Sequence, residues 1–256
     1  MKQKFAVQLY TLRNECEKDF PGVLRQLRQM GWAGVELAGL YSYSAEEISE
    51  VLQETGLQTA GMHVSFQRLS SELESVLKEA QLFKTTTLIC PSVPHELRNE
   101  EGYRQFRNQL NDIAREIRQD GYTLSFHNHA FEFETNVDGR NALEYLLEPS
   151  ADNAILAEID VYWVKKAGKN PAAFICPYSY RMPTMHVKDM TNDEHRTYAE
   201  IGTGVIDFDP ILIWGEQNGV AWYIVEQDVC QGNPMDCVNT SLKNLHRIAE
   251  RLVEIV

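Results

Sequence analysis

The sequence has little of what would place the chain in a membrane or on nucleic acid. No apolar run approaches the roughly 20 residues that a membrane span needs, and residues 1–5 lead into a strand pattern without the apolar core of a signal peptide. The 24 Lys and Arg residues are scattered, and 37 Asp and Glu residues bring the net charge to −13. We therefore expect a cytoplasmic protein that acts on a small molecule, with no membrane and no nucleic-acid partner.

Paired cysteines and glycine-rich phosphate loops are missing as well. The five cysteines are odd in number and widely spaced, and no Cys-x-x-Cys pair occurs, which argues against a disulfide framework and a thiolate zinc site. The turn after the first apolar run, residues 8–13, has no dinucleotide-binding glycine pattern, and the chain has no Gly-Lys-Ser/Thr loop. We expect reduced, mostly buried thiols, and a doubly wound open sheet is disfavoured.

What the sequence does contain is an alternation of short apolar runs and helical patterns that continues to the end of the chain. Strands are predicted at 5–10, 34–37, 58–64, 86–91, 122–127, 154–160, 184–188 and 222–227. Helices are predicted at 20–30, 44–56, 71–83, 100–119, 141–147, 171–179, 210–218 and 236–253, the second opened by a Ser44–Glu47 capping box. No linker divides the eight units, so residues 1–256 are predicted to form a single-domain (β/α)8 TIM barrel of the α/β class.

Polar residues end nearly all of these apolar runs. In a barrel the active site lies at the C-terminal ends of the strands, so these residues are the candidates for function. Side-chain alternation aims some of them: Glu158 and Asp160 fall on the face opposite the apolar Ile159, and therefore point into the barrel. The candidates are Gln8, Glu36, His63, His127, His129, Glu132, Asp160, His186, Lys188, Glu226 and Asp228.

This set of acids and imidazoles suits one divalent metal ion. Without thiolates, Mn²⁺, Mg²⁺, Co²⁺ and Zn²⁺ are the candidates. Carboxylates left over beside such an ion indicate proton transfer next to a carbonyl group, which the ion would polarise. Lys188 would hold a developing oxyanion or a hydroxyl group, or form a salt bridge with Asp160 or Asp189.

Smaller features are expected to shape the substrate site. Glu36 and His63, on early strands, are predicted to contact substrate hydroxyl groups. Trp163 would form a wall for a sugar ring or pack its own loop. The segment Gly202-Thr-Gly204 would cradle a phosphate with its backbone amides or form a tight turn.

The chain resembles the xylose-isomerase-like barrel superfamily of sugar (phosphate) isomerases and epimerases, in its His-Asn-His branch, along essentially its full length. The segments that carry the resemblance are 7–13, 34–37, 126–133, 158–168, 185–189, 201–207 and 224–228. The resemblance implies a carbohydrate substrate and one divalent ion, often manganese, held by Glu132, Asp160, His186 and Glu226. It also implies that Glu132 and Glu226 take and return a proton across the substrate.

The fifth strand departs from the pattern of the better-known epimerases. His127 stands where their metal-binding Glu stands, and Glu132 has the opposite parity to His127 and His129. His127 or His129 would then serve as ligand or base in place of Glu132, while His129 and Glu158 also remain candidates for substrate contact. A histidine here would suit one-sided proton transfer, as in a keto-inositol dehydratase or a 3-keto-glycoside eliminase or hydratase.

Two other classes belong to the same superfamily or fold. Multi-zinc endonucleases would need more imidazoles than the seven in this chain, and the acidic composition opposes DNA binding. A barrel that binds a sugar without catalysis would be separated from an enzyme by its metal content and turnover. The sequence is compatible with a monomer and with a homo-oligomer.

Overall fold

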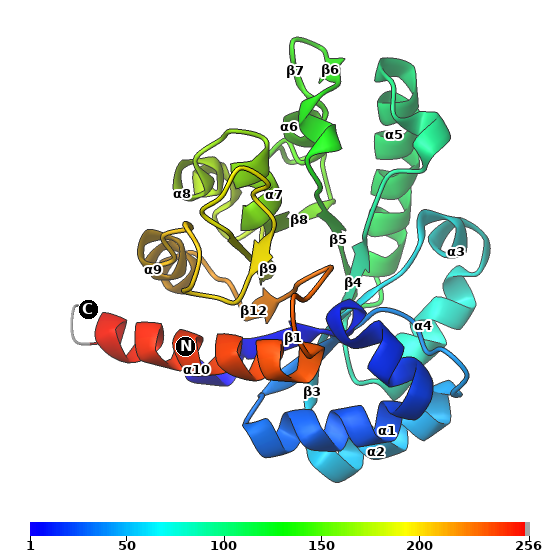
Figure 1. The fold of residues 1–256 in the computed structure, drawn as a ribbon. Helices are drawn as coiled ribbons and strands as arrows, with labels where there is room; N and C mark the ends of the chain where they lie inside the picture. Colours follow the sequence, from blue (N-terminus) through cyan, green and yellow to red (C-terminus); the bar gives the residue numbers. More distant parts are fainter. Residues whose placement is uncertain (254–256) are drawn as a thin grey trace.

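Eight parallel strands close into a barrel in the computed structural model, which describes residues 1–253 (Figure 1). The strands are β1 (Phe5–Gln8), β2 (Gly34–Leu37), β3 (Gln58–His63), β4 (Thr87–Cys90), β5 (Thr123–His127), β8 (Leu156–Asp160), β9 (Thr184–Val187) and β12 (Trp222–Val225). Their order around the barrel is β1-β12-β9-β8-β5-β4-β3-β2, and β2 pairs with β1 to complete the ring. The closure confirms the predicted barrel and rules out the open doubly wound sheet.

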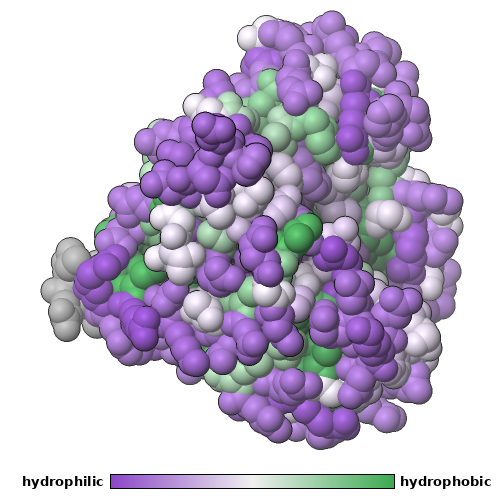
Figure 2. Space-filling view, viewed as in Figure 1, coloured by the Kyte–Doolittle hydropathy of each residue, from purple (hydrophilic) through white to green (hydrophobic). Residues whose placement is uncertain are grey.

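Helices surround the barrel, as Figure 1 shows. They are α1 (Arg13–Met30), α2 (Ala45–Thr55), α3 (Phe66–Ser71), α4 (Leu73–Leu82), α5 (Glu100–Arg118), α6 (Ala142–Leu146), α7 (Val161–Lys166), α8 (Pro171–Phe174), α9 (Asp209–Gln217) and α10 (Pro234–Val253). None of the helices among the described residues has the length and apolar character of a membrane span. The visible face in Figure 2 is mostly hydrophilic, with small hydrophobic areas scattered over it.

The main core lies between the strands and the helices. Helix α5 shows how the sequence builds it, because its buried residues recur at helical spacing and face the barrel. Phe106 of this helix packs edge-on against Phe126 of β5, with ring centroids 5.6 Å apart, and both side chains are fully buried. Each such side chain stabilises the fold by about 1.5–3 kcal/mol relative to an exposed one.

The inside of the barrel has an apolar floor and a polar upper part. Ala6, Ala60 and Ile224 form a small apolar cluster of their own, while Glu36 and Glu158 lie in the polar part and are fully buried. Ala6 and Ala60 are small because the inward faces of eight strands meet in a confined space.

A glycine makes room for one of the interior acids. A Cβ atom added to Gly61 would lie 2.5 Å from Cδ1 of Ile89 and 3.2 Å from Oε1 of Glu36. A side chain at this position of β3 would therefore clash inside the barrel, and the absence of one lets the Glu36 carboxylate sit there.

Several predicted boundaries are wrong, each for a local reason. The first strand ends at Gln8, not at residue 10, because the Gln8 side chain accepts a hydrogen bond from the Tyr10 amide and a 3₁₀ turn, Leu9–Leu12, follows. Helix α1 begins seven residues early and is kinked at Asp19. The helix predicted at 171–179 breaks into α8 and a 3₁₀ turn, Cys176–Tyr178, which contains a proline.

Other local predictions are confirmed. Ser44 and Glu47 form both hydrogen bonds of a capping box at α2. All five cysteines are free, three of them buried. Sequence patterns do not indicate α3, α7 or the two short hairpins, β6 (Asn136–Val137) with β7 (Arg140–Asn141) and β10 (Asp189–Met190) with β11 (Tyr198–Ala199).

Candidate active site

The polar strand ends of β5, β8, β9 and β12 converge inside the barrel mouth. Strand register brings them level, since Asp160 of β8 lies beside His186 of β9, which in turn lies beside Ile224 of β12. Among the described residues, two groups of four side chains place one donor atom each within 4.8 Å of one another. The donor group is His127, Asp160, His186 and Glu226, and the inner group is His63, His127, Glu158 and His186.

The donor group has the composition of a divalent-metal site. Nδ1 of His186 lies 3.1 Å from Oε2 of Glu226 and 4.0 Å from Oδ2 of Asp160. All four side chains are 5 % exposed or less. Two carboxylates and two imidazoles without thiolate favour ions such as Mn²⁺, Co²⁺ and Zn²⁺.

Unpartnered polar atoms support the fit of an ion to the donor group. Oδ2 of Asp160 and Nδ1 of His127 are buried and have no hydrogen bond. Nζ of Lys188 lies 3.1 Å from that Asp160 oxygen and Oε2 of Glu158 lies 3.4 Å from that His127 nitrogen, both outside hydrogen-bond geometry. A buried polar atom without a partner is costly, and a bound cation would supply the missing interaction.

Glu36 lies with the inner group behind the donor group and fixes the orientation of His186. Oε2 of Glu36 is 2.7 Å from Nε2 of His186, so the opposite ring nitrogen, Nδ1, faces Asp160 and Glu226. Nε2 of His63 lies between two acids, 3.0 Å from Glu36 and 2.9 Å from Glu158. A carboxylate on the far nitrogen of a ligating histidine sets its tautomer and raises its basicity.

Lys188 is a fully buried cation at the edge of the donor group. Its ammonium lies 2.8 Å from Glu226, 3.0 Å from Asp228 and 3.1 Å from Asp160. Of the two salt-bridge partners predicted for it, Asp160 is therefore one. The rings of Tyr162, Trp163 and Tyr198 surround the ammonium at 5.4 to 5.9 Å.

The charges in the donor group shift one another's protonation. Burial raises the pKa of the Asp160 carboxyl to about 6, against the opposing effect of Lys188. Burial also acts on Glu226, but Lys188 and His186 outweigh it and hold the pKa of Glu226 well below its usual range. Burial lowers the pKa of Lys188, yet Asp160 and Glu226 outweigh it and raise that pKa well above its usual value. Glu226 is thus ionised, and Lys188 is a fixed cation at neutral pH.

The two histidines of the His-Asn-His segment are held neutral. Burial, and then the neighbouring His186, lower the pKa of His127 well below its usual value. Burial, and then Lys188, lower the pKa of His129 to about 4. The neutral imidazole is the form that binds a metal ion or accepts a proton.

Glu132 lies outside both groups, and the fifth strand contributes His127 instead. The chain turns out of β5 at Asn128, whose side-chain oxygen accepts a hydrogen bond from the Asp160 amide at 2.9 Å. Glu132 then falls in a 3₁₀ turn, Phe131–Phe133, where its Oε2 accepts a hydrogen bond from the His129 amide at 2.8 Å. Burial raises the pKa of Glu132 to about 8. The turn that the opposite parity of Glu132 required does exist, but it leads Glu132 away from the other donors.

A cavity of about 510 Å³ opens beside the donor group. His127 and Glu226 line it, together with His63, His129 and Asp228. Three residues expected to contact substrate do not line it: Glu36 and Glu158 are buried behind His63, and Trp163 lies behind His129, with ring centroids 5.5 Å apart. The lining residues that were not singled out in the sequence include two cations, Arg98 and Arg68, because arginines in predicted loops or helices carry no spacing signal.

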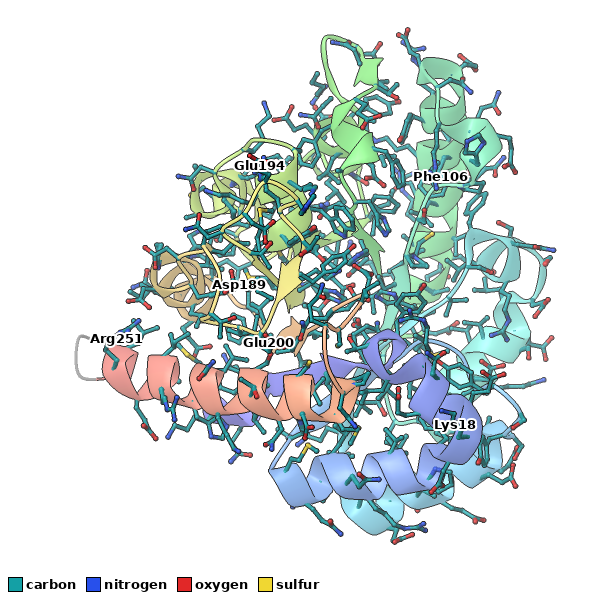
Figure 3. All side chains as sticks on the ribbon, in the orientation of Figure 1. Lys18, Phe106, Asp189, Glu194, Glu200 and Arg251 are labelled. Atoms are coloured by element: carbon teal, nitrogen blue, oxygen red, sulfur yellow. The ribbon has the colours of Figure 1, made fainter. Side chains whose placement is uncertain are left out.

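The Gly202-Thr-Gly204 segment forms a tight turn and not an open phosphate cradle. The amides of Gly202 and Gly204 both donate to Oδ2 of Asp189, each at 2.9 Å. Oδ1 of Asp189 accepts two more amides, from Met190 and Ile206. Figure 3 labels Asp189 beside β9. The amides that would hold a phosphate already hold an internal carboxylate.

Comparison with known proteins agrees with this architecture. The family described as "Xylose isomerase-like TIM barrel" matches residues 24–245. An inosose dehydratase of Clostridium beijerinckii is 21% identical over 86% of this chain and 86% of its own length. The rhizopine catabolism protein MocC of Rhizobium meliloti is 24% identical over 97% and 89%.

A solved structure has a similar fold. A sugar phosphate isomerase/epimerase from Parabacteroides distasonis superposes with a TM-score of 0.80 at 19% identity, covering 95% of this chain and 98% of that one. A closed barrel with its polar residues gathered at the strand ends, together with a family match over most of the chain, identifies the protein as a member of the xylose isomerase-like TIM barrel family.

Proposed function

We propose that the protein is a divalent-metal-dependent enzyme that removes a proton next to the carbonyl group of a carbohydrate, as a sugar or sugar phosphate isomerase or epimerase. The convergence of His127, Asp160, His186 and Glu226 beside an open cavity is the observation that carries the proposal. The bound ion, with Mn²⁺ the first candidate and Mg²⁺, Co²⁺ and Zn²⁺ the others, would polarise the carbonyl group and stabilise the enediolate.

The protein residues then divide the remaining work. Glu226 is ionised and lines the cavity, so it is the proposed base. Neutral His127, a member of the donor group, is the group that we propose to give or take the second proton, and it takes the ligand position predicted for Glu132. Lys188 holds Glu226 and Asp160 in place and supplies positive charge where an oxyanion develops. His63 and His129 line the cavity and would contact substrate hydroxyl groups.

A second candidate is a dehydratase or eliminase acting on a keto-inositol or a 3-keto-glycoside. The observation that favours it is the asymmetry of the donor group, in which an imidazole faces Glu226 where an epimerase would use a second carboxylate. Two of the relatives in sequence are named inosose dehydratases. One-sided proton removal followed by loss of a hydroxyl group would need only one strong base.

Metal analysis followed by solvent exchange tests the proposal. The purified protein, loaded with Mn²⁺, would be incubated in D₂O with a panel of ketoses, keto-inositols and 3-keto-glycosides. Exchange of a C–H next to the carbonyl supports proton abstraction. The product then separates the two candidates, because an isomerase or epimerase keeps the formula of the substrate and a dehydratase loses water. Absence of exchange in every member, with metal bound, would contradict both.

A further inference from the structure

Arg98 is a cation that faces the same cavity as the donor group. Its neighbours on the cavity wall include Ser92 and Phe131 on its own side, and Glu226 on the side of the donor group. Two arginines line this cavity, Arg98 and Arg68. Arg98 and Arg68 differ in whether a protein carboxylate neutralises their charge.

Arg68 is neutralised by protein carboxylates. Its Nε lies 2.9 Å from Glu72, and its two amino groups lie 2.6 and 3.1 Å from the oxygens of Glu79. Within the described part of the chain, Arg98 has no carboxylate within 4.0 Å, the range of a salt bridge, and its Nη1 has no hydrogen bond to a protein atom. The charge of Arg98 is therefore available to a bound molecule.

Arg98 is nevertheless held in one position. Its Nε donates to the carbonyl oxygen of Val93 at 3.0 Å, and its Nη2 donates to Oγ of Ser92 at 3.2 Å. Its guanidinium carbon lies 3.7 Å from the centre of the Phe131 ring. A guanidinium fixed on an aromatic face loses less side-chain freedom when it binds a ligand than a free one does.

Glu132, a buried acid whose pKa the Arg98 charge lowers, does not neutralise Arg98. Burial raises the pKa of Glu132 to about 8, and the Arg98 charge opposes this rise without cancelling it. At neutral pH the Glu132 carboxyl thus keeps its proton.

The loop at Gly202 and Gly204 is not an alternative site for an anion of the substrate, because the amides of both glycines donate to the Asp189 carboxylate.

We propose that Arg98 binds an acidic group of the substrate, a carboxylate or a phosphate monoester, at a part of the molecule away from the reacting carbon. Phe131, on which Arg98 lies, stacks on His129 with ring centroids 5.3 Å apart. The ring centroids of His129 and His127 are 5.2 Å apart, so the rings of Phe131 and His129 lie between Arg98 and the donor group. The guanidinium fork suits the paired oxygens of both acids. The inference rests on the proposed function for the position of the reacting carbon.

Matched substrates and variants test the role of Arg98. A neutral keto-sugar, its uronate and its 6-phosphate would be compared by the rate of solvent deuterium exchange, with kcat and KM measured for each. In the wild type we expect a lower KM for an acidic member than for the neutral one, and the better acid identifies carboxylate or phosphate. Arg98→Met should raise that KM about 10- to 100-fold and leave the neutral sugar unchanged. Arg98→Lys should recover part of the loss, because it keeps the charge but not the fork.

Arg68→Met is the matched control, since Arg68 lines the same cavity but is ion-paired. It should leave the ratio of acidic to neutral KM unchanged. Equal KM values for acidic and neutral sugars in the wild type, or an equal loss on both in Arg98→Met, would overturn the proposal. If no sugar exchanges, the proposed function has failed, and binding decides about Arg98. Gluconate and inorganic phosphate should then raise the Tm of the wild type but not of Arg98→Met, and no shift from either ion would overturn the role of Arg98.

Discussion

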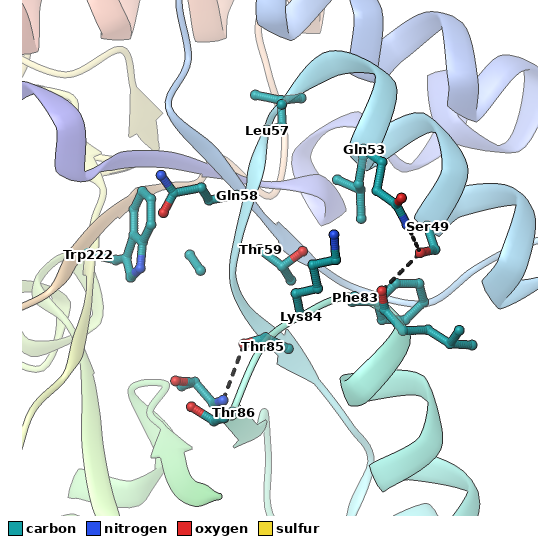
Figure 4. Close-up of a pocket in the computed structure, with 15 residues that line it drawn as sticks. Ser49, Gln53, Leu57, Gln58, Thr59, Phe83, Lys84, Thr85, Thr86 and Trp222 are labelled. Atoms are coloured by element: carbon teal, nitrogen blue, oxygen red, sulfur yellow. Dashed lines mark hydrogen bonds between the residues drawn. The ribbon is translucent and has the colours of Figure 1, made fainter.

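Two cavities lie at opposite ends of the barrel, and the larger one is at the end whose lining has no acid or imidazole. The cavity at the N-terminal ends of β3 and β4 measures about 640 Å³, against about 510 Å³ at the mouth. Its lining contains no His, Cys, Asp or Glu side chain, and its one charged residue is Lys84. In Figure 4 some of its polar groups hydrogen-bond to one another, as Gln53 does to Ser49 and Ser49 to the carbonyl oxygen of Leu82.

The mouth has the opposite character. Its acids and imidazoles crowd within hydrogen-bond distance, and several of their buried polar atoms, including Oδ2 of Asp160 and Nδ1 of His127, lack partners. A cluster of buried charges with unpartnered atoms costs stability, so its presence indicates a functional site better than the volume of a cavity does. Four predictions break or sharpen this comparison.

The largest effect is expected from Asp160→Asn. Asp160 also caps α7, because its Oδ1 accepts hydrogen bonds from the amides of Tyr162 and Trp163, and asparagine can keep this cap. The change should remove bound metal and lower turnover by about 10³-fold or more, with a folded barrel, and His186→Ala should do the same. Metal per chain and circular dichroism are the measurements. Full metal occupancy in Asp160→Asn would refute the assignment of the donor group.

Lys188→Met tests whether the ammonium balances the acids of the mouth. Without it, Asp160, Glu226 and Asp228 face one another in a buried site, so the metal-free variant should lose about 3–5 kcal/mol of stability. Added Mn²⁺ should then raise Tm more in the variant than in the wild type.

Lys84→Met, at the other cavity, is its control. Lys84 is exposed and has no salt bridge among the described residues, so the change should alter stability by less than about 0.5 kcal/mol. Equal Tm values for the two metal-free variants would show that the mouth needs no fixed cation.

Glu132→Gln separates a buried structural acid from the donor acids. In the folded chain the Glu132 carboxyl keeps its proton up to about pH 8, whereas in the unfolded chain it loses the proton near pH 4.5. The stability that this group contributes is full below the lower value and is lost as the pH rises through the higher one.

Glutamine mimics the protonated acid at every pH. The variant should therefore match the wild type near about pH 5 and exceed its Tm near about pH 9, where a difference of about 1 kcal/mol would shift Tm by about 2–4 °C. Thermal unfolding at the two pH values is the measurement. A variant that is less stable than the wild type at the higher pH would show that the fold stabilises the ionised Glu132 carboxylate, so that burial does not raise its pKa.

Thr59→Val is expected to have the smallest effect. Oγ1 of Thr59 lines the larger cavity and is buried without a partner. Valine has the same shape without the hydroxyl group, so stability should stay equal or rise by about 1 kcal/mol or less, and turnover should not change. Loss of turnover in this variant would mean that the end opposite the mouth takes part in function.

Much of the fold could be predicted because each strand carries its own signal. Eight apolar runs, the Ser44–Glu47 capping box and the strand-end acids are local patterns, and all eight strands are found near their predicted places. What could not be predicted depends on contacts between distant segments or on a side chain with two roles. Helix α7 begins because Asp160, which sequence reasoning assigned to a metal, also accepts two amides of the next turn.

The site was predictable in its membership more than in its roles. Strand parity correctly aimed Glu158 and Asp160 inward, since alternation is fixed by strand geometry alone. The place of Glu132 depends on the turn at Asn128, whose partner is the amide of Asp160, 32 residues further along the chain. Arg98 has no carboxylate partner among the described residues, and no pattern in one sequence predicts which side chains will surround it in the fold.

The Asp189 carboxylate has a consequence for how this barrel could change its substrates. It occupies the amides of Gly202 and Gly204 as a phosphate group would, so the loop already contains a built-in anion. A variant of this barrel could bind a phosphate in this loop only after the Asp189 side chain was replaced by a smaller one. The space left by the carboxylate would then suit an external anion, because the backbone amides of the loop already point into it.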